Sequence, residues 1–171
     1  MITTILSDFS NVILRFNKPT FIGSLNGLYR ELLNSGKPFN FFDYYEFDNE
    51  LLSYYKKLGK KYSMNIFTTS QIQNDPKSKE VLENMFSQIL SAENLGVNKA
   101  EPAAYVMVAE KLGKDTEEIV FIDDQIKNIE AAEKAGMTGI HYKNVGDLKL
   151  KIRKNTSITR ARYSSSCELS V

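Results

Sequence analysis

The sequence contains a single cysteine, Cys167, and an almost balanced set of charges, and both features narrow the possible functions. One cysteine cannot form a disulfide within the chain, so a reducing, cytoplasmic location is expected. The net charge is +1 and no long basic run precedes the C-terminal region, so nothing suggests an electrostatic footprint for nucleic acid. We therefore expect a cytoplasmic protein with no nucleic-acid partner.

Long apolar runs are also missing. No stretch approaches the ~18 consecutive apolar residues that a membrane span needs, so no membrane association is expected. The first eight residues, MITTILSD, lack the charged start and apolar centre of a signal peptide. Hydrophobic residues make up 42% of the 171 positions, which predicts a globular domain with a sizeable core.

The most informative stretch is Ile119–Asn128, IVFIDDQIKN. Four apolar residues precede Asp123 and Asp124, and helical spacing then continues through Ala135. A short apolar run bounded by polar residues is typical of a buried strand in a parallel sheet. The two aspartates therefore lie where a strand ends and a helix begins, which is the edge where open α/β sheets bind ligands.

Two interpretations of this acidic pair stay open at this point. Aspartate is common at helix starts for backbone reasons alone. Alternatively, two neighbouring carboxylates at a partly buried strand end repel each other, and a cation would keep both ionised. Hard oxygen ligands of this kind suit Mg²⁺.

Other predicted strands end in polar residues too. Ile2–Leu6 is followed by Ser7 and Asp8, and Met64–Phe67 by Thr68, Thr69 and Ser70. Strands at these positions alternate with predicted helices, which indicates a parallel sheet with right-handed crossovers. The further strands are predicted over 86–91 and 139–142, and the helices over 21–33, 48–62, 77–85, 103–112 and the residues up to 135.

Each polar residue alone has an ordinary explanation: Asp8 an Asx turn, Thr68 a turn hydroxyl, Lys99 an exposed surface lysine. Together they form a more specific set, because strand ends of one parallel sheet meet at one edge. A carboxylate, a hydroxyl, a cation and a metal-binding pair suit phosphoryl transfer.

The order of these motifs resembles that of the haloacid dehalogenase superfamily of phosphatases and related hydrolases. The resemblance rests on SDFSNVIL, IFTTS, GVNKAEPAAY and VFIDDQIKNIEAAEKAGM, which run from residue 7 to 137. It implies a Rossmann-like three-layer α/β/α fold over residues 1–150, with a short helical cap insertion over about 17–47. Residues 151–171 are expected to form a polar tail.

The resemblance also implies roles for individual residues. Asp8 would be the nucleophile that forms a phospho-aspartate, while Thr68 and Lys99 would assist as catalytic residues. Phe9, Ser10 and Thr69 would bind substrate. The implied cofactor is Mg²⁺, and its expected ligands are Asp8, the backbone carbonyl of Ser10, Asp123 and Asp124. Asn128 would support the loop.

Two departures from the family pattern limit this expectation. Phosphatases of the family generally carry an aspartate two positions after the nucleophile as general acid/base, and this chain has Ser10 there. Turnover is therefore expected to be slow, unless the leaving group is good or another base is supplied. The short cap leaves an open site, which favours a bulky substrate or closure by a partner subunit.

The aromatic stretch Phe39–Phe47, FNFFDYYEF, has two interpretations. It can be core packing, or it can be an exposed surface through which two copies form a homodimer. For the whole chain the leading hypothesis is a Mg²⁺-dependent phosphatase acting on an unidentified phosphorylated substrate. The alternatives are a non-catalytic relative that binds a phospho-ligand or protein, and a dehalogenase-type hydrolase acting at carbon.

Overall fold

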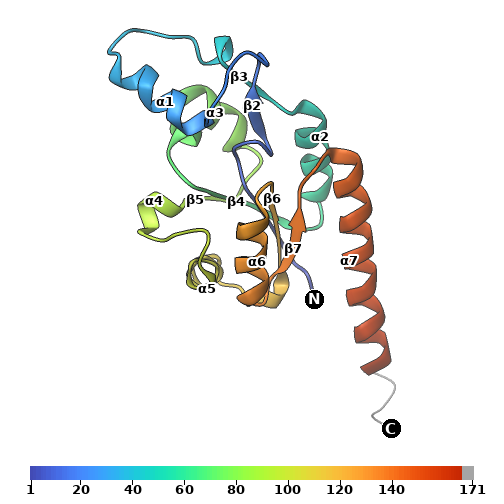
Figure 1. Cartoon of the computed structure of the whole chain (residues 1–171). Helices are drawn as coiled ribbons and strands as arrows, with labels where there is room; N and C mark the ends of the chain where they lie inside the picture. Colours follow the sequence, from blue (N-terminus) through green and yellow to red (C-terminus); the bar gives the residue numbers. More distant parts are fainter. Residues whose placement is uncertain (167–171) are drawn as a thin grey trace.

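A five-stranded parallel sheet forms the centre of the molecule (Figure 1). A computed structural model of the chain describes residues 1–166, with side chains described as far as Asn155. The α/β layered sheet predicted from the sequence is confirmed. Its spatial order is β5-β4-β1-β6-β7, with bounds Gln88–Ser91, Ser63–Thr68, Thr4–Ser7, Ile119–Asp123 and Thr138–His141.

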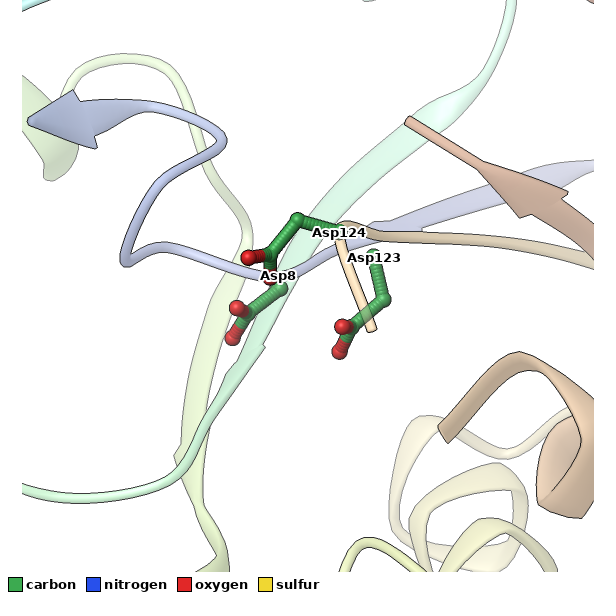
Figure 2. Close-up of side chains that lie close together, drawn as sticks. All are labelled: Asp8, Asp123 and Asp124. Carbon is green, nitrogen blue, oxygen red and sulfur yellow. The ribbon is translucent and has the colours of Figure 1, made fainter. Parts of the chain in front are cut away.

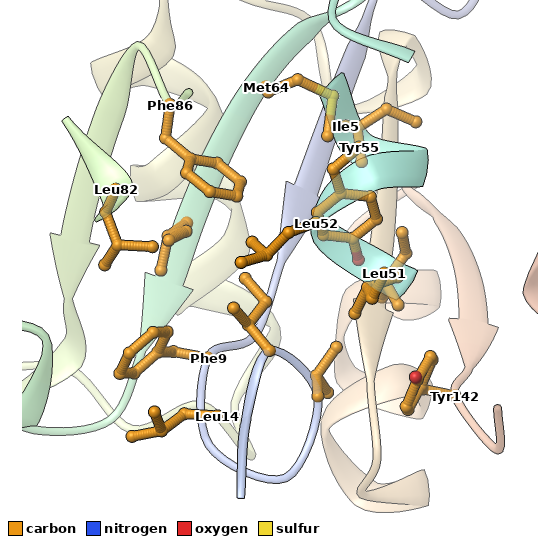
Figure 3. Packing of buried hydrophobic residues seen from close by; sticks show 14 of the residues in the cluster. Ile5, Phe9, Leu14, Leu51, Leu52, Tyr55, Met64, Leu82, Phe86 and Tyr142 are labelled. Atoms are coloured by element: carbon orange, nitrogen blue, oxygen red, sulfur yellow. The ribbon is translucent and has the colours of Figure 1, made fainter. Parts of the chain in front are cut away.

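Alternate residues of each strand face opposite helical layers, as the pleat of a strand requires. Ile5 belongs to one buried cluster and its neighbour Leu6 to the other, and the same division separates Ile66 from Phe67. The first cluster packs beneath α2 (Asn49–Leu58), α3 (Pro76–Leu82) and α7 (Val145–Ser166), as Figure 3 shows in part. The second packs against α5 (Pro102–Leu112) and α6 (Ile126–Lys134).

Helix ends follow local sequence signals. Asp48 is the N-cap of α2, because its side chain accepts a hydrogen bond from the backbone N–H of Leu51 at 2.9 Å. Pro102 opens α5, and Gly113 closes it in the left-handed conformation, with φ of 64°. These two boundaries agree with the sequence prediction. The four-residue α4 (Ala92–Leu95) links β5 to the loop that carries Lys99.

The cap region is small. The strands β2 (Leu14–Phe16) and β3 (Tyr45–Phe47) pair antiparallel, and between them the described chain contains α1 (Leu25–Asn34) and a 3₁₀ turn over 41–43. Helix α1 begins at Leu25, four residues later than predicted, because the side chain of Ser24 provides the N-cap acceptor. In Figure 1 this segment extends above the body of the molecule.

The aromatic segment 39–47 contributes mostly to the core. Phe41, Tyr45 and Phe47 are buried, whereas Phe42 is 46% exposed. Most of this segment therefore packs in the core, as the first of the two interpretations predicts. Association of two copies through its exposed remainder stays a prediction.

Residues 151–166 belong to helix α7, whereas the sequence alone left the order of this polar region open. Helix α7 continues through Ser166 and buries Leu148 and Ile152 against the first cluster. Because most residues of this segment are polar, the four-residue spacing of Leu148 and Ile152 was not recognised as a helical pattern in the sequence. Cys167 lies outside the described residues. Within residues 1–166, no helix is long and apolar enough to cross a membrane.

Gly139 allows α6 to approach β7 closely, and an alanine there should destabilise the fold. A β-carbon at this position would lie 2.6 Å from Cγ2 of Ile129 and within 2.9 Å of the Glu133 side chain. We expect Gly139→Ala to lower the free energy of unfolding by about 1–3 kcal/mol, as overpacking does. Urea denaturation followed by circular dichroism measures it.

The matched control is Gly59→Ala at the end of α2. Its β-carbon would lie at ordinary contact distances of 3.4 to 3.8 Å from Met64 Cγ and the carbonyl oxygens of Tyr55 and Lys56, and the backbone φ of −61° suits alanine. This variant should stay within about 0.5 kcal/mol of the wild type. Equal losses for the two variants would contradict the close packing of α6 on β7.

Candidate active site

Three carboxylates meet at the carboxyl edge of the sheet (Figure 2). Asp8 follows β1, Asp123 ends β6, and Asp124 comes directly after it. These strands are neighbours, and the backbone N–H of Asp8 donates to the carbonyl of Ile122 at 2.7 Å. One oxygen from each of the three carboxylates lies within 4.8 Å of the others. The sheet register therefore brings together acids that are more than a hundred residues apart.

Lys99 lies between two of these acids. Its ammonium is 2.7 Å from Asp8 Oδ1 and 2.8 Å from Asp123 Oδ2. It also donates a hydrogen bond to the carbonyl of Phe67, the residue before Thr68, at 2.9 Å. The side chains of Lys99, Asp8 and Asp123 are each no more than 6% exposed. Lys99 is thus a buried ion-pair residue rather than the solvated lysine that the sequence also allowed.

Asp123 and Asp124 have different surroundings. Both oxygens of Asp123 are engaged: Oδ1 accepts from the backbone N–H of Gln125, and Oδ2 from the amide of Asn128. Asp124 Oδ2 accepts from the amide of Asn11 at 3.3 Å, but its buried Oδ1 has no hydrogen-bond partner among the described residues. Asp123 therefore holds the backbone and Asn128 at the start of α6, while Asp124 keeps one oxygen that has no hydrogen-bond partner among the described residues.

The clustering of acids shifts their proton affinities. Burial raises the pKa of Asp8 to about 7; Lys99 opposes this shift, and the charge of Asp123 adds to it. Burial would lower the pKa of Lys99, but attraction to Asp8 and Asp123 outweighs it, so the pKa is raised. The pKa of Asp124 is raised by burial and by repulsion from Asp123. The carboxylates thus carry more negative charge than the single ammonium compensates.

These features fit a divalent cation with hard oxygen ligands. A buried carboxylate oxygen without a donor costs free energy unless a cation or water meets it. Mg²⁺ binds through one or two carboxylates and keeps several waters. Asp8 and Asp124 offer that set, and they flank the turn that contains the carbonyl of Ser10.

The other expected site residues differ in how far their side chains are buried. Thr68 is buried at the end of β4, and Thr69 is exposed. The side chain of Phe9 is fully buried in the core, so only its backbone can face a ligand. The hydroxyl of Ser10 accepts a hydrogen bond from the amide of Asn26 in α1 at 3.4 Å.

A pocket of about 400 Å³ adjoins the acidic cluster, since Lys99 lines it and contacts Asp8. Arg30 from α1 and Lys127 from α6 bring positive charge to its wall, and Glu93 brings one negative charge. Arg30 donates to the hydroxyl of Ser70 at 3.2 Å, which in turn donates to Glu93 at 2.8 Å. The loops after β4 and β5 are thereby connected to the cap helix.

The contribution of α1 to this site was not among the sequence predictions. Asn26 and Arg30 are four residues apart, so they lie on the same face of a helix. That spacing was visible in the sequence, but nothing local indicated that this face meets the loops after β1 and β4. The hydrogen bonds of Ser7 to the carbonyl of Asp8 and to Tyr55 were also not predictable from a local pattern.

The raised pKa of Asp8 predicts a pH dependence of stability in metal-free protein. The folded state holds a proton on Asp8 that the unfolded chain releases near pH 4, so this stabilisation is complete below about pH 4 and is lost as the pH rises through 7. Relative to Asp8→Asn, the wild type should lose up to about 4 kcal/mol of unfolding free energy between pH 4 and 8. Chemical denaturation in a chelating buffer measures this difference.

The control for this titration is Asp43→Asn, which changes an exposed carboxylate in the cap. Its stability profile should run parallel to that of the wild type. A constant difference between wild type and Asp8→Asn across this range would show that Asp8 has an ordinary pKa.

The chain is similar in sequence and in fold to known hydrolases. The model of the haloacid dehalogenase-like hydrolases matches residues 40–136. A glyceraldehyde 3-phosphate phosphatase from Methanopyrus kandleri is 30% identical over 63 residues. That match covers 36% of this chain and 27% of the relative, so the chain corresponds to about a quarter of that protein's length.

Solved structures show the same fold at low identity. A haloacid dehalogenase family enzyme from Bacteroides thetaiotaomicron, in complex with magnesium and inorganic phosphate, has a TM-score of 0.62 and 16% identity, covering 84% of this chain and 95% of its own. A hydrolase of the same family from Porphyromonas gingivalis gives 0.63 and 17%, covering 90% and 98%. A 2-haloacid dehalogenase from Pseudomonas syringae gives 0.56 and 16%, covering 83% and 86%. With its motifs, its sheet and a family match over more than half of its length, the chain belongs to the haloacid dehalogenase-like hydrolases.

Proposed function

We propose that the protein is a Mg²⁺-dependent phosphohydrolase in which Asp8 is the nucleophile. The observation that carries this proposal is the ammonium of Lys99, which lies 2.7 Å from Asp8 and 2.8 Å from Asp123 beside a third carboxylate. A nucleophilic carboxylate that must approach an anionic phosphate needs such positive charge nearby. The phosphatase relative from Methanopyrus kandleri also favours a phosphorylated substrate.

In the first step a carboxylate oxygen of Asp8 attacks phosphorus, and the bond from phosphorus to the leaving oxygen breaks. The electron pair departs with the leaving group, and Asp8 becomes a phospho-aspartate. Lys99 offsets the negative charge that gathers on the phosphoryl oxygens. Thr68 and Thr69, at the end of β4, supply hydroxyl and backbone N–H donors for those oxygens, with the backbone of Phe9 and Ser10 on the other side.

The residues present fit Mg²⁺, with unequal contributions from the acidic pair. Asp8, the carbonyl of Ser10 and Asp124 would hold the ion directly, because Asp124 Oδ1 has no partner among the described residues. Asp123 would act through Lys99 and the α6 backbone, since both its oxygens are engaged. When bound, the ion neutralises charge on the phosphoryl group and so lowers the barrier to attack by an anion.

Two alternatives remain to be separated by experiment. A non-catalytic phospho-ligand binder is favoured by Ser10, because a hydroxyl is a poor proton shuttle at neutral pH. A dehalogenase-type hydrolase acting at carbon is disfavoured by the carboxylate cluster, which such chemistry does not need. Similarity of fold to the Pseudomonas syringae enzyme does not decide between them, since one fold supports several chemistries.

The direct test is phosphate release from a panel that includes p-nitrophenyl phosphate, acetyl phosphate and glyceraldehyde 3-phosphate, with and without Mg²⁺. We expect release that requires Mg²⁺ and falls at least about 10³-fold in Asp8→Asn, because the nucleophile is lost. Asp43→Asn is the matched control and should keep full activity. Mg²⁺-independent turnover of a haloacid, or no turnover at all, would reject the phosphatase.

Metal binding separates the two neighbouring aspartates. Asp124→Ala should weaken Mg²⁺ affinity by more than about tenfold, and by more than Asp123→Ala does, because only Asp124 offers an open oxygen. Isothermal titration calorimetry of folded variants gives both affinities. A larger loss in Asp123→Ala would reverse the assignment of the direct ligand.

A further inference from the structure

The position two residues after the nucleophile offers no acid to a leaving group. Ser10 has a hydroxyl there, and the group that reaches it is the amide of Asn26, at 3.4 Å. Neither group gives up a proton readily at neutral pH. Asn26 Oδ1 is buried and has no partner among the described residues, so the amide is not part of a longer proton path there.

Three of the four ionisable groups of the neighbouring pocket are poor replacements. Its described lining includes Arg30, Glu93, Lys99 and Lys127. Arginine keeps its proton in proteins. Glu93 accepts hydrogen bonds from Ser70 and Gln71, at 2.8 and 3.5 Å, which are the contacts of a carboxylate. Lys99 is committed to two carboxylates.

Apart from Lys99 and the acidic cluster that it contacts, the pocket wall carries two positive charges and one negative charge. Lys99 is balanced by Asp8 and Asp123, so Arg30 and Lys127 face the single charge of Glu93. Arg30 has five N–H donors, and the structure directs one of them to Ser70. A guanidinium with further donors at a pocket wall suits a planar carboxylate or a phosphate oxygen pair.

Helix α1 supplies both the amide that contacts Ser10 and one of the cations of the pocket wall. Asn26, which contacts Ser10, and Arg30, which contacts Ser70, are one helical turn apart on the same face. A general-acid position that offers only a hydroxyl and an amide, with cations beside it, suits a leaving group that departs as a stable anion.

We infer that the substrate is a mixed anhydride of phosphoric acid, with an acyl phosphate as the representative, rather than the phosphate ester of an alcohol. This inference rests on the proposed phosphatase function. Asp8 forms the new bond to phosphorus, the bond from phosphorus to the acyl oxygen breaks, and its electron pair leaves on a carboxylate that needs no proton. Arg30 and Lys127 stabilise that carboxylate. Water then displaces Asp8 from phosphorus, and its released protons pass to solvent and phosphate.

The test compares acetyl phosphate with ethyl phosphate, which are similar in size and differ in the leaving group: a carboxylate in one and an alkoxide in the other. With Mg²⁺, and with Asp8→Asn as the blank for spontaneous hydrolysis, kcat/KM of the wild type should be at least about 10³-fold higher for acetyl phosphate. Ser10→Asp should raise turnover of ethyl phosphate by about 10²-fold or more, the usual contribution of a general acid, and change acetyl phosphate far less.

Two results would overturn the inference while leaving the phosphatase intact. One is a wild-type preference below tenfold; the other is a folded Ser10→Asp variant without a selective gain on ethyl phosphate. If that variant does not fold, a series of substituted phenyl phosphates serves on the wild type: kcat/KM should fall steeply as the phenol becomes less acidic, and a flat series overturns the inference. No phosphate from any substrate would instead reject the proposed function itself.

The contribution of Lys127 to the pocket wall can be tested separately. Lys127→Gln should lower kcat/KM for acetyl phosphate more than for ethyl phosphate, because the departing carboxylate loses a counter-charge. If Lys127 were instead the proton donor, ethyl phosphate would lose more, which would contradict the inference. Lys134→Gln, an exposed lysine on the same helix, is the matched control and should change neither.

Discussion

The ammonium of Lys99 between Asp8 and Asp123 is the contact on which the rest of the site depends. Three ionised carboxylates and one ammonium would leave two uncompensated negative charges, and most of the cluster is buried. Such an excess is costly in a low-dielectric interior unless it is protonated or meets a cation. Under the proposed function, the excess that destabilises the metal-free cluster would favour binding of a divalent ion, so stability and catalysis would draw on one set of charges.

The sheet order explains why these charges meet. Strand β1 lies between β4 and β6, so Asp8 has the Thr68 turn on one side and Asp123 on the other. Apolar residues hold the three strands between two helical layers, which fixes the register that the ion pairs need. Asp123 then serves two purposes at once: it accepts the backbone N–H that starts α6, and it orients Lys99. Neither aspartate is the N-cap of α6, which is Gln125; Asp123 instead accepts the backbone N–H of that residue, whereas Oδ1 of Asp124 has no hydrogen-bond partner among the described residues.

Strands and their polar ends could be predicted because each signal is local. Residues 119–122 are apolar on both faces of the strand, and an acid directly after such a run must lie at the carboxyl edge. The start of α1, the helical course of α7 and the role of Arg30 could not be predicted in the same way. Their positions depend on packing between distant segments: Tyr29 of α1 hydrogen-bonds Asp75 at 3.3 Å, and Ile152 packs on the core. No short pattern encodes either contact.

The anchoring of α1 also changes what a reduced cap means for the site. Tyr45 donates to the carbonyl of Leu25 at 3.1 Å, and Tyr29 and Arg30 contact the segment after β4. With buried aromatic contacts at its base, this helix is a fixed wall of the pocket rather than a separate lid. A fixed wall cannot exclude water by closing, so discrimination must come from charges that are already in place. Under the proposed function, that requirement favours substrates whose leaving group is recognised by its charge, and it links the absence of an acid at Ser10 to the presence of Arg30 on the same face of α1 as Asn26.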